Sequence, residues 1–471
     1  MRKDWAGSGV DLHLELSAGG GRRGALEDAL RAAVRDGRLA RGTRLPSTRS
    51  LAAQLRLSRG TVTAAYDQLV AEGYLTTRPG SGTEVAAVST PGPVPPAPEP
   101  AALPEPVHDL RPGQPDVSAF PARAWLRATR HVLATAPAAV LGLCDPRGRI
   151  ELRRALAGYL ARTRGVVTTP EHIVVTTGFV QSLNLLAAVI GDGPIAMEDP
   201  GHDFYREVVR RAGREVVPLP VDELGARVGT LTPAVAAAVV TPAHQYPMGV
   251  PLHPSRRHAL REWGGLVVED DYDGEFRYDR QPVGAFQGTA PEQAVYFGTT
   301  SESLAPALRL AWMAVPPALI GPVTEAKLHA DIHTEVLGQL VLARLIETHD
   351  YDRHIRAARL RYRRRRELLR ARLAAALPGA VLPGVAAGLR TLLLLPGGGP
   401  SEAELLDACA RRGIALRPAS PLWHGAGREG LLIGYAGPSE RAYPHALEAL
   451  AETLTRAAGR EPAADSGRST S

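Results

Sequence analysis

The first 85 residues show helical spacing of their apolar positions. Apolar side chains recur three and four residues apart over 25–36, 48–55 and 59–72, which predicts three amphipathic helices. Ser47 and Ser58 stand directly before the second and third helices, where a serine oxygen caps free backbone N–H groups. The expected core face of these helices consists of Leu26, Leu30, Ala33, Val34, Leu51, Leu55, Val62, Ala65 and Leu69.

A pair of short strands follows the third helix. Strand-type residues over 74–78 and 83–85 flank the sequence Pro79-Gly80-Ser81-Gly82, which predicts a tight turn. Helix, helix, turn, helix and hairpin together predict a winged helix-turn-helix, whose third helix enters the major groove of DNA. Arg49 and Arg59 could then reach base edges or phosphates. A small helical unit with solvated arginines is the alternative.

After about residue 108 the pattern changes to helices that alternate with short apolar strands. This alternation predicts an α/β domain with a largely parallel sheet. Three of the strands, over 173–177, 265–268 and 295–299, run directly into glycine, carboxylate or hydroxyl residues. Because ligands bind at the carboxyl ends of parallel strands, these strand ends predict a ligand site.

The residue types at these strand ends suit a phosphorylated pyridine. A strand, Gly178 and a helix start form an anion site through backbone N–H groups. The hydroxyls of Thr299 and Ser301, with Arg309 nearby, also suit a phosphate. Asp270 and Tyr272 could hold a pyridine nitrogen and a phenolic oxygen. A solvated acidic loop at Glu269-Asp270-Asp271 is the alternative.

Between these two patterns lies a proline-rich stretch. Pro91 to Pro106 contain eight prolines, and proline lacks the N–H group that helices and central strands need. We therefore expect an extended linker there. The expected divisions are a DNA-binding unit over 11–85, a linker over 86–107, a second domain over 108–456 and a disordered tail over 457–471.

Charge and cysteine usage narrow the class of protein. Residues 1–85 hold 13 Lys and Arg against 9 Asp and Glu, which suits a phosphate backbone, although an ordinary solvated surface also explains it. No run of 18 apolar residues and no secretory signal are present, so we expect a cytoplasmic protein without a membrane span. Cys144 and Cys409 have no metal-ligand spacing and predict neither a metal site nor a disulfide.

Residues 25–85 resemble the GntR-type DNA-binding domain. The matching stretches are Gly37-Arg38-Leu39, Arg44-Leu45-Pro46-Ser47-Thr48-Arg49, Leu57-Ser58-Arg59-Gly60-Thr61-Val62, Ala71-Glu72-Gly73-Tyr74-Leu75 and Gly80-Ser81-Gly82-Thr83. The resemblance implies that the DNA contacts come from Ser47, Arg49, Arg59, Thr61 and Gly82. The implied partner is a double-stranded DNA operator.

The rest of the chain resembles fold-type I, pyridoxal-phosphate aminotransferases, and the whole arrangement resembles the MocR family of regulators. The matching stretches include Gly113-Gln114-Pro115-Asp116, Asp145-Pro146-Arg147-Gly148, Glu198-Asp199-Pro200-Gly201, Thr241-Pro242 and His244-Gln245. The implied fold is an α+β winged helix-turn-helix followed by an α/β fold-type I domain. That domain would have a large lobe with a mostly parallel sheet and a smaller α+β C-terminal lobe. The family also implies a homodimer.

The resemblance implies a cofactor site at the predicted strand ends. The phosphate would be held by Gly178, Phe179, Val180, Thr299, Ser301 and Arg309. The ring would be held by Asp270 at its nitrogen, Tyr272 at its oxygen and His202 on its face.

This chain differs from the family at the position of the residue that bonds to the cofactor. The family's lysine, in Ser-Lys-x-Leu-x-Pro-x-Leu-Arg, corresponds to Glu302 in the segment from Ser301 to Arg309. A carboxylate cannot form an imine with the cofactor aldehyde, so no catalytic residue is expected. Lys327, 25 residues further on, is the alternative anchor. We expect non-covalent binding of pyridoxal phosphate, its amine form or an amino-acid adduct, and Glu302 would favour a cationic group.

Other family positions have changed as well. Leu143 and Cys144 stand where the family has a tyrosine that reaches the partner's phosphate and a glycine. Tyr246 stands at the aminotransferase asparagine. Gly430 stands at the carboxylate-binding arginine, with Arg428 two residues away.

Arginines crowd the helix expected around 353–366. We interpret it as a solvated helix between the lobes, and a second DNA-contacting face is the alternative.

Three functions fit these observations. The first is a transcriptional regulator whose large domain dimerises and senses an effector, either an amine, an amino acid or a form of vitamin B6. The second is a pyridoxal-phosphate aminotransferase with an accessory DNA-binding arm. The third is a regulator whose large domain has lost all use of the cofactor. Glu302 favours the first over the second.

Overall fold

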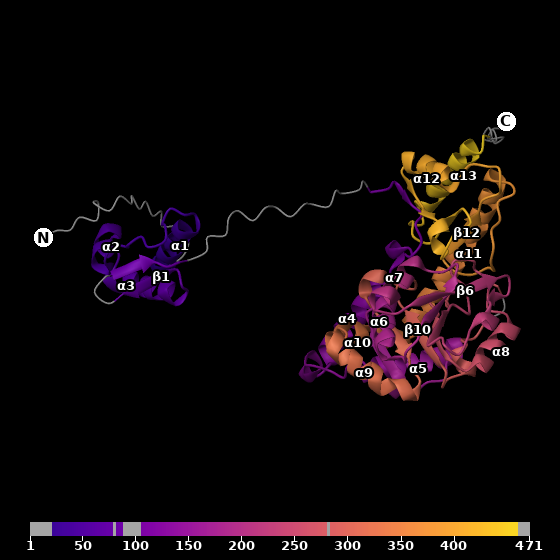
Figure 1. Cartoon of the computed structure of the whole chain (residues 1–471), viewed down its shortest axis with the longest axis horizontal. Coiled ribbons are helices and arrows are strands. Elements are labelled where there is room, and N and C mark those ends of the chain that lie inside the picture. The colour runs from indigo at the N-terminus through magenta and orange to yellow at the C-terminus, as the bar shows by residue number, and fades with distance from the viewer. Residues whose placement is uncertain (1–20, 79–81, 88–104, 280–282, 460–471) are drawn as a thin grey trace. The chain divides into compact units, whose positions relative to one another are not determined.

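The computed structural model describes residues 21–78, 82–87, 105–279 and 283–459. The chain divides into two compact units, Met1–Pro104 and Glu105–Ser471, and each is described by itself (Figure 1). Most of the predicted linker (88–104), the wing turn (79–81) and most of the predicted disordered tail (460–471) lie outside the described residues.

The described part of the first unit contains three helices and an antiparallel hairpin, as the apolar pattern predicts. Its elements are α1 (Arg22–Arg35), α2 (Thr48–Leu55), α3 (Arg59–Ala71), β1 (Leu75–Arg78) and β2 (Gly82–Val85). Both expected caps are confirmed: the oxygen of Ser47 accepts the Ser50 N–H at 3.1 Å, and that of Ser58 accepts the Thr61 N–H at 3.0 Å. The nine expected core residues are buried, apart from Leu55, which is half-buried.

Polar contacts fix the packing of α3 in this unit. The hydroxyl of Tyr66 donates to the carbonyl of Pro46 at 3.0 Å, which ties α3 to the turn before α2. Arg31 on α1 donates twice to Glu72, directly after α3, at 3.0 Å each. Arg35 also donates to the hydroxyl of Tyr74 at 2.8 Å. Glu72 and Tyr74 therefore join the end of α3 to α1 through the side chains of Arg31 and Arg35.

The second unit is built on an eight-stranded, mostly parallel sheet, which confirms the predicted fold class. The spatial order is β4-β11-β10-β9-β8-β5-β6-β7. Only β11 and β7 run antiparallel to their neighbours. The bounds are β4 (Ile173–Thr176), β5 (Ile195–Asp199), β6 (Val216–Asp222), β7 (Gly225–Ala226), β8 (Ala237–Val240), β9 (Leu266–Asp270), β10 (Ala294–Thr299) and β11 (Ala311–Ala314).

Helices cover both faces of this sheet, so its central strands are apolar on both sides. In β8, Ala237 and Val239 pack in one apolar cluster and Ala238 and Val240 pack in another. Figure 1 shows helices gathered around the strands of the large lobe. Their bounds are α4 (Ala122–Thr135), α5 (Ile150–Arg164), α6 (Phe179–Val189), α7 (Asp203–Arg211), α8 (Pro254–Trp263), α9 (Pro317–Asp331) and α10 (Val336–Glu347).

A smaller C-terminal lobe, orange to yellow in Figure 1, completes the second unit. It contains an antiparallel sheet in the order β12-β15-β14 and two helices. The bounds are β12 (Arg390–Leu394), β14 (Arg417–Pro418), β15 (Gly430–Gly434), α12 (Glu402–Arg411) and α13 (Tyr443–Ala457). The early strand β3 (His108–Asp109) pairs in parallel with β13 (Ile414–Ala415), so the start of the unit joins this lobe.

The long helix α11 (Asp350–Ala376) leads into the C-terminal lobe, and its arginines are more than a solvated face. Arg365 is 1% exposed and donates to Asp116 and Glu440. Arg366 donates to the Val385 carbonyl at 2.7 Å, and Arg359 donates to the Glu275 carbonyl. The expectation of a solvated helix is therefore wrong for Arg365 and Arg366, which are buried and hydrogen-bonded, whereas Arg359 is exposed as expected.

Candidate functional site

The carboxyl ends of β4, β5, β8, β9 and β10 meet around a cavity of about 310 Å³. This is the sheet edge at which parallel α/β folds bind ligands. Residues from the C-terminal lobe, Arg390 and Arg417, close the cavity from the other side. All nine residues expected to hold a cofactor line it: Gly178, Phe179, Val180, His202, Asp270, Tyr272, Thr299, Ser301 and Arg309.

One end of the cavity is built to hold an anion. Helix α6 begins at Phe179, directly after Gly178, so the free N–H groups of its first turn lie at the cavity wall. Gly178 has φ +148°, and a Cβ there would lie 2.7 Å from the Arg309 guanidinium. A glycine is therefore required for Arg309 to lie against this turn. The hydroxyl of Thr299 donates to that of Ser301 at 3.0 Å beside it.

The middle of the cavity holds a buried carboxylate with a free oxygen. Oδ1 of Asp270 has no hydrogen-bond partner among the described residues. Burial and the charges of Asp271 and Asp273 raise the pKa of Asp270 well above its usual range. A ligand with a protonated ring nitrogen would supply the missing donor and the missing positive charge.

Aromatic rings form the adjoining wall. The ring of His202 stacks on Tyr205 at 3.9 Å between centroids and on Tyr246 at 4.9 Å. Burial and the guanidinium groups of Arg417 and Arg390 lower the pKa of His202 to about 3. His202 therefore remains neutral near pH 7, and its ring lies between those of Tyr205 and Tyr246 at the cavity wall.

Glu302, the residue at the family's lysine position, also lines the cavity and forms an ion pair there. Nη2 of Arg390 donates to its Oε1 at 2.6 Å, and the two side chains are 7% and 10% exposed. Arg390 also lies over the rings of Tyr272 and Tyr246, at 4.6 and 5.0 Å from their centroids. The negative charge of Glu302 is thus compensated inside the protein.

Sequence reasoning missed Arg390 and Arg417, which both line the cavity from the C-terminal lobe. One signal was available for Arg390: it is the one charged residue of the strand Arg390–Leu394, which ends in three leucines. Arg428 is exposed and is not among the cavity residues. Lys327 is not among them either: it lies on α9, where it pairs with Asp331.

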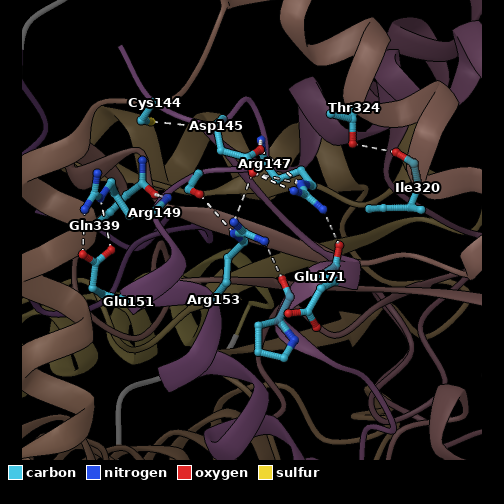
Figure 2. Close-up of polar contacts among 12 residues, drawn as sticks. Cys144, Asp145, Arg147, Arg149, Glu151, Arg153, Glu171, Ile320, Thr324 and Gln339 are labelled. Atoms are coloured by element: carbon cyan, nitrogen blue, oxygen red, sulfur yellow. Dashed lines mark hydrogen bonds and ion pairs between the residues drawn. The ribbon is translucent and has the colours of Figure 1, made fainter. Parts of the chain in front are cut away.

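The Asp145-Pro146-Arg147-Gly148 turn forms a rigid hydrogen-bonded network (Figure 2). Asp145 accepts from Nη2 of Arg147 at 2.7 Å and of Arg153 at 3.2 Å. Gln339 accepts the Arg149 N–H at 2.8 Å, and a Cβ on Gly148 would lie 2.6 Å from the same glutamine oxygen. The turn is fixed by these contacts, and Leu143, just before it, is 80% exposed.

The residues expected to contact DNA lie at the starts of three elements of the first unit: Ser47 and Arg49 at α2, Arg59 and Thr61 at α3, and Gly82 at β2. Arg49 on α2 and Arg59 at the first position of α3 are exposed. Neither side chain has a hydrogen bond or ion pair with another residue in the described parts of the chain. The hydroxyls of Thr61 and Ser58 form a hydrogen bond at 2.8 Å. Gly82 is exposed at the start of β2. Free cations at a helix start suit contact with phosphates and bases.

Comparisons with known proteins agree with both units. The model of bacterial regulatory proteins of the gntR family matches residues 23–85, and that of aminotransferase class I and II matches residues 105–450. The HTH-type pyridoxine biosynthesis transcriptional regulator PdxR of Corynebacterium glutamicum is 32% identical over 447 residues, covering 91% of this chain and 95% of that regulator. The probable rhizopine catabolism regulatory protein MocR of Rhizobium meliloti is 34% identical over 365 residues, covering 72% of this chain and 74% of that protein.

The second unit also matches solved aminotransferases. The crystal structure of an archaeal alanine:glyoxylate aminotransferase superposes with a TM-score of 0.68 at 23% identity, covering 74% of this chain and 91% of the other. That likeness shows a shared fold.

Fold, site and comparisons together define a helix-turn-helix transcriptional regulator that carries an aminotransferase-type domain. Within that class, the chain belongs to the MocR family. No helix among the described residues has the length and apolar character needed to cross a bilayer.

Proposed function

We propose that the chain is a sequence-specific regulator whose aminotransferase-type domain binds a phosphorylated form of vitamin B6 without a covalent bond. The observation that carries this proposal is the cavity itself. It combines an anion cradle and a free buried carboxylate with Glu302 at the position of the bond-forming lysine. The relative PdxR carries pyridoxine biosynthesis in its name, which supports a ligand of this class.

The cavity residues fit such a ligand. The backbone of Gly178, Phe179 and Val180, with Thr299, Ser301 and Arg309, would hold the phosphate. Asp270 would pair with the ring nitrogen, Tyr272 would face the ring oxygen, and His202 would lie on the ring face. When bonded to a lysine, this cofactor supplies an electron sink for amino-acid chemistry. Glu302 cannot form that bond, so we propose a sensor rather than an enzyme.

DNA recognition belongs to the first unit. We propose that Ser47, Arg49, Arg59, Thr61 and Gly82 contact a double-stranded operator. The proposed divisions are a DNA-binding unit over 11–85, a linker over 86–107, an effector domain over 108–456 and a tail over 457–471. Such a protein would act in the cytoplasm, where it meets chromosomal DNA.

We also propose a homodimer formed through the second unit. Large apolar side chains on and after α4 are exposed: Leu126 at 49%, Leu133 at 60%, Leu141 at 71% and Leu143 at 80%. An exposed apolar patch of this kind marks an interface. Sedimentation of the full chain should show a dimer, and Leu143→Glu should weaken it. A monomer at micromolar concentration would remove this part of the proposal.

Substitution at the lysine position tests the non-covalent proposal. Purified wild-type protein, saturated with pyridoxal phosphate and treated with borohydride, should show no trapped adduct on Lys327. Glu302→Lys should gain visible absorbance and a trapped adduct at position 302, because Asp270 and the residues proposed to hold the phosphate line the same cavity. A wild-type adduct on Lys327 would instead favour an aminotransferase with an accessory DNA-binding arm.

A further inference from the structure

Each residue of the buried ion pair in the cavity has one polar atom without a partner in the described parts of the chain. Oε2 of Glu302 is an acceptor, and Nε–H of Arg390 is a donor. Both atoms are buried, and neither has a hydrogen-bond partner among the described residues. The 2.6 Å contact between Arg390 and the other oxygen of Glu302 keeps the two groups together. A buried polar atom without a partner is costly, so a ligand that satisfies both atoms is favoured.

The neighbouring tyrosine does not supply these partners. The hydroxyl of Tyr272 donates its proton to the carbonyl of His244 at 3.0 Å. The guanidinium group of Arg390 lies over the ring of Tyr272, at 4.6 Å from its centroid, and the two residues share no hydrogen bond among the described parts of the chain. Nε of Arg390 is therefore a buried donor, and Oε2 of Glu302 a buried acceptor, that no described residue satisfies.

The required ligand carries one donor and one acceptor next to each other. Pyridoxamine phosphate has this pattern, because its protonated amine donates and its neighbouring ring oxygen accepts. Pyridoxal phosphate has two acceptors there, the aldehyde oxygen and the ring oxygen. Its aldehyde oxygen would face Oε2 of Glu302 with no proton between them, which leaves a buried carboxylate oxygen unsatisfied.

We infer that Glu302, held by Arg390, makes the cavity selective for the amine form of the cofactor over the aldehyde form. This inference rests on the proposed function, since it assumes that the cavity binds a phosphorylated vitamin B6 compound. Glu302 is then a specificity-determining residue that replaces a covalent anchor with a charge-assisted hydrogen bond.

Calorimetric titration of the full chain tests this selectivity. The probes are pyridoxamine phosphate, pyridoxal phosphate and pyridoxine phosphate, whose hydroxyl is a neutral donor. Burial raises the pKa of Glu302, and Arg390 opposes that rise, so the titrations belong at about pH 8. We expect pyridoxamine phosphate to bind about tenfold more tightly than pyridoxal phosphate, with pyridoxine phosphate between them.

Two variants show whether the preference for the amine form depends on contact with Glu302 or on any negative charge near the cavity. Glu302→Gln should bring the affinities for the amine and aldehyde forms within about threefold of each other, because the amide nitrogen can donate to an aldehyde. Asp203→Asn is the matched control, since Asp203 carries the same charge, pairs with the cavity residue Arg417 and is 31% exposed. We expect Asp203→Asn to keep the wild-type preference.

Each outcome decides the inference. Equal affinities in the wild type, or tighter binding of pyridoxal phosphate, would overturn it while leaving the proposed function intact. If Glu302→Gln still prefers pyridoxamine phosphate, Glu302 does not determine the preference. If Asp203→Asn loses the preference as fully as Glu302→Gln does, direct contact with Glu302 is also ruled out as its cause. No binding of any probe by the wild type would overturn the proposed function itself. The wild-type comparison stands even if Glu302→Gln fails to fold.

Discussion

Two ion pairs at the cavity differ in how far their side chains are buried. Two ion pairs flank Tyr246: Glu302 with Arg390, and Asp203 with Arg417. The first pair is nearly buried, with side chains 10% and 7% exposed, whereas the side chains of the second are 31% and 30% exposed. Removing one partner of a buried pair strands a charge in a low-dielectric site, and removing one partner of an exposed pair does not.

The two arginines should therefore differ in their effect on stability. We expect Arg390→Gln to lower the free energy of unfolding of the second unit by about 3–5 kcal/mol, because it leaves Glu302 buried and unpaired. Arg417→Gln should cost about 0–1 kcal/mol. Tryptophan fluorescence during denaturant unfolding measures this, since four of the five tryptophans lie after residue 104. Equal losses in the two variants would contradict the assigned burial.

A second residue-scale prediction concerns Glu198, which lines the same cavity. Burial raises its pKa from 4.5 to about 7, although Thr241 and Gln245 donate hydrogen bonds to it. Because the folded pKa lies above the unfolded pKa, its stabilising contribution is complete below about pH 4.5 and disappears as the pH rises through 7.

Glu198→Gln should therefore gain stability relative to the wild type as the pH rises from 5 to 8. The shift corresponds to roughly 3 kcal/mol at most. Denaturant unfolding of both proteins at each pH measures the difference between their free energies of unfolding. The other buried carboxyl groups are the same in both proteins, so their contributions cancel in this difference. A constant difference between the two proteins would show that Glu198 ionises normally.

At the scale of elements, both of the binding functions that we propose lie at helix starts. In the first unit, α3 starts at Arg59 with its cap on Ser58. In the second unit, α6 starts at Phe179, directly after Gly178. Both starts present unpaired backbone N–H groups and nearby arginines to an anion. The anion proposed for α3 is the DNA backbone, and the one proposed for α6 is the ligand phosphate.

The start of α3 gives a prediction for DNA binding. We expect Arg59→Gln to weaken binding to a selected operator by about 1–3 kcal/mol. Arg23→Gln is the matched control, because Arg23 is exposed on α1 and pairs with Glu27. Fluorescence anisotropy with labelled DNA at several salt concentrations measures affinity and salt slope together. Equal binding by Arg59→Gln and Arg23→Gln would remove Arg59 from the proposed interface.

The apolar pattern predicted the elements of the first unit to within a few residues. Spacing and capping serines are local signals, and helix 48–55 begins and ends where the sequence indicates. Strand ends were also predictable, because polar residues follow each buried strand. Arg390 was not predictable in this way, since its partner Glu302 lies 88 residues away and periodicity carries no information about such pairs. The buried role of Arg365 was missed for the same reason.

At the scale of the whole molecule, one chain contains a gntR-type unit and an aminotransferase-type unit with a proposed ligand cavity. A ligand in the second unit can alter DNA binding only if it has different affinities for two states of the protein. The cavity supports such a difference, because Arg390 and Arg417 of the C-terminal lobe line it together with residues of the large lobe. A ligand that bridges the two lobes would favour one arrangement of them.

The most direct test of this account measures DNA binding by the full chain with and without its proposed ligand. Operator DNA is first selected from genomic fragments with purified protein. Affinity and footprint are then measured with no ligand and at saturating pyridoxamine phosphate or pyridoxal phosphate. We expect specific binding whose affinity changes at least about fivefold, or whose footprint changes, when the ligand is added. Identical affinity and footprint at saturation, or no specific DNA at all, would contradict a ligand-responsive regulator.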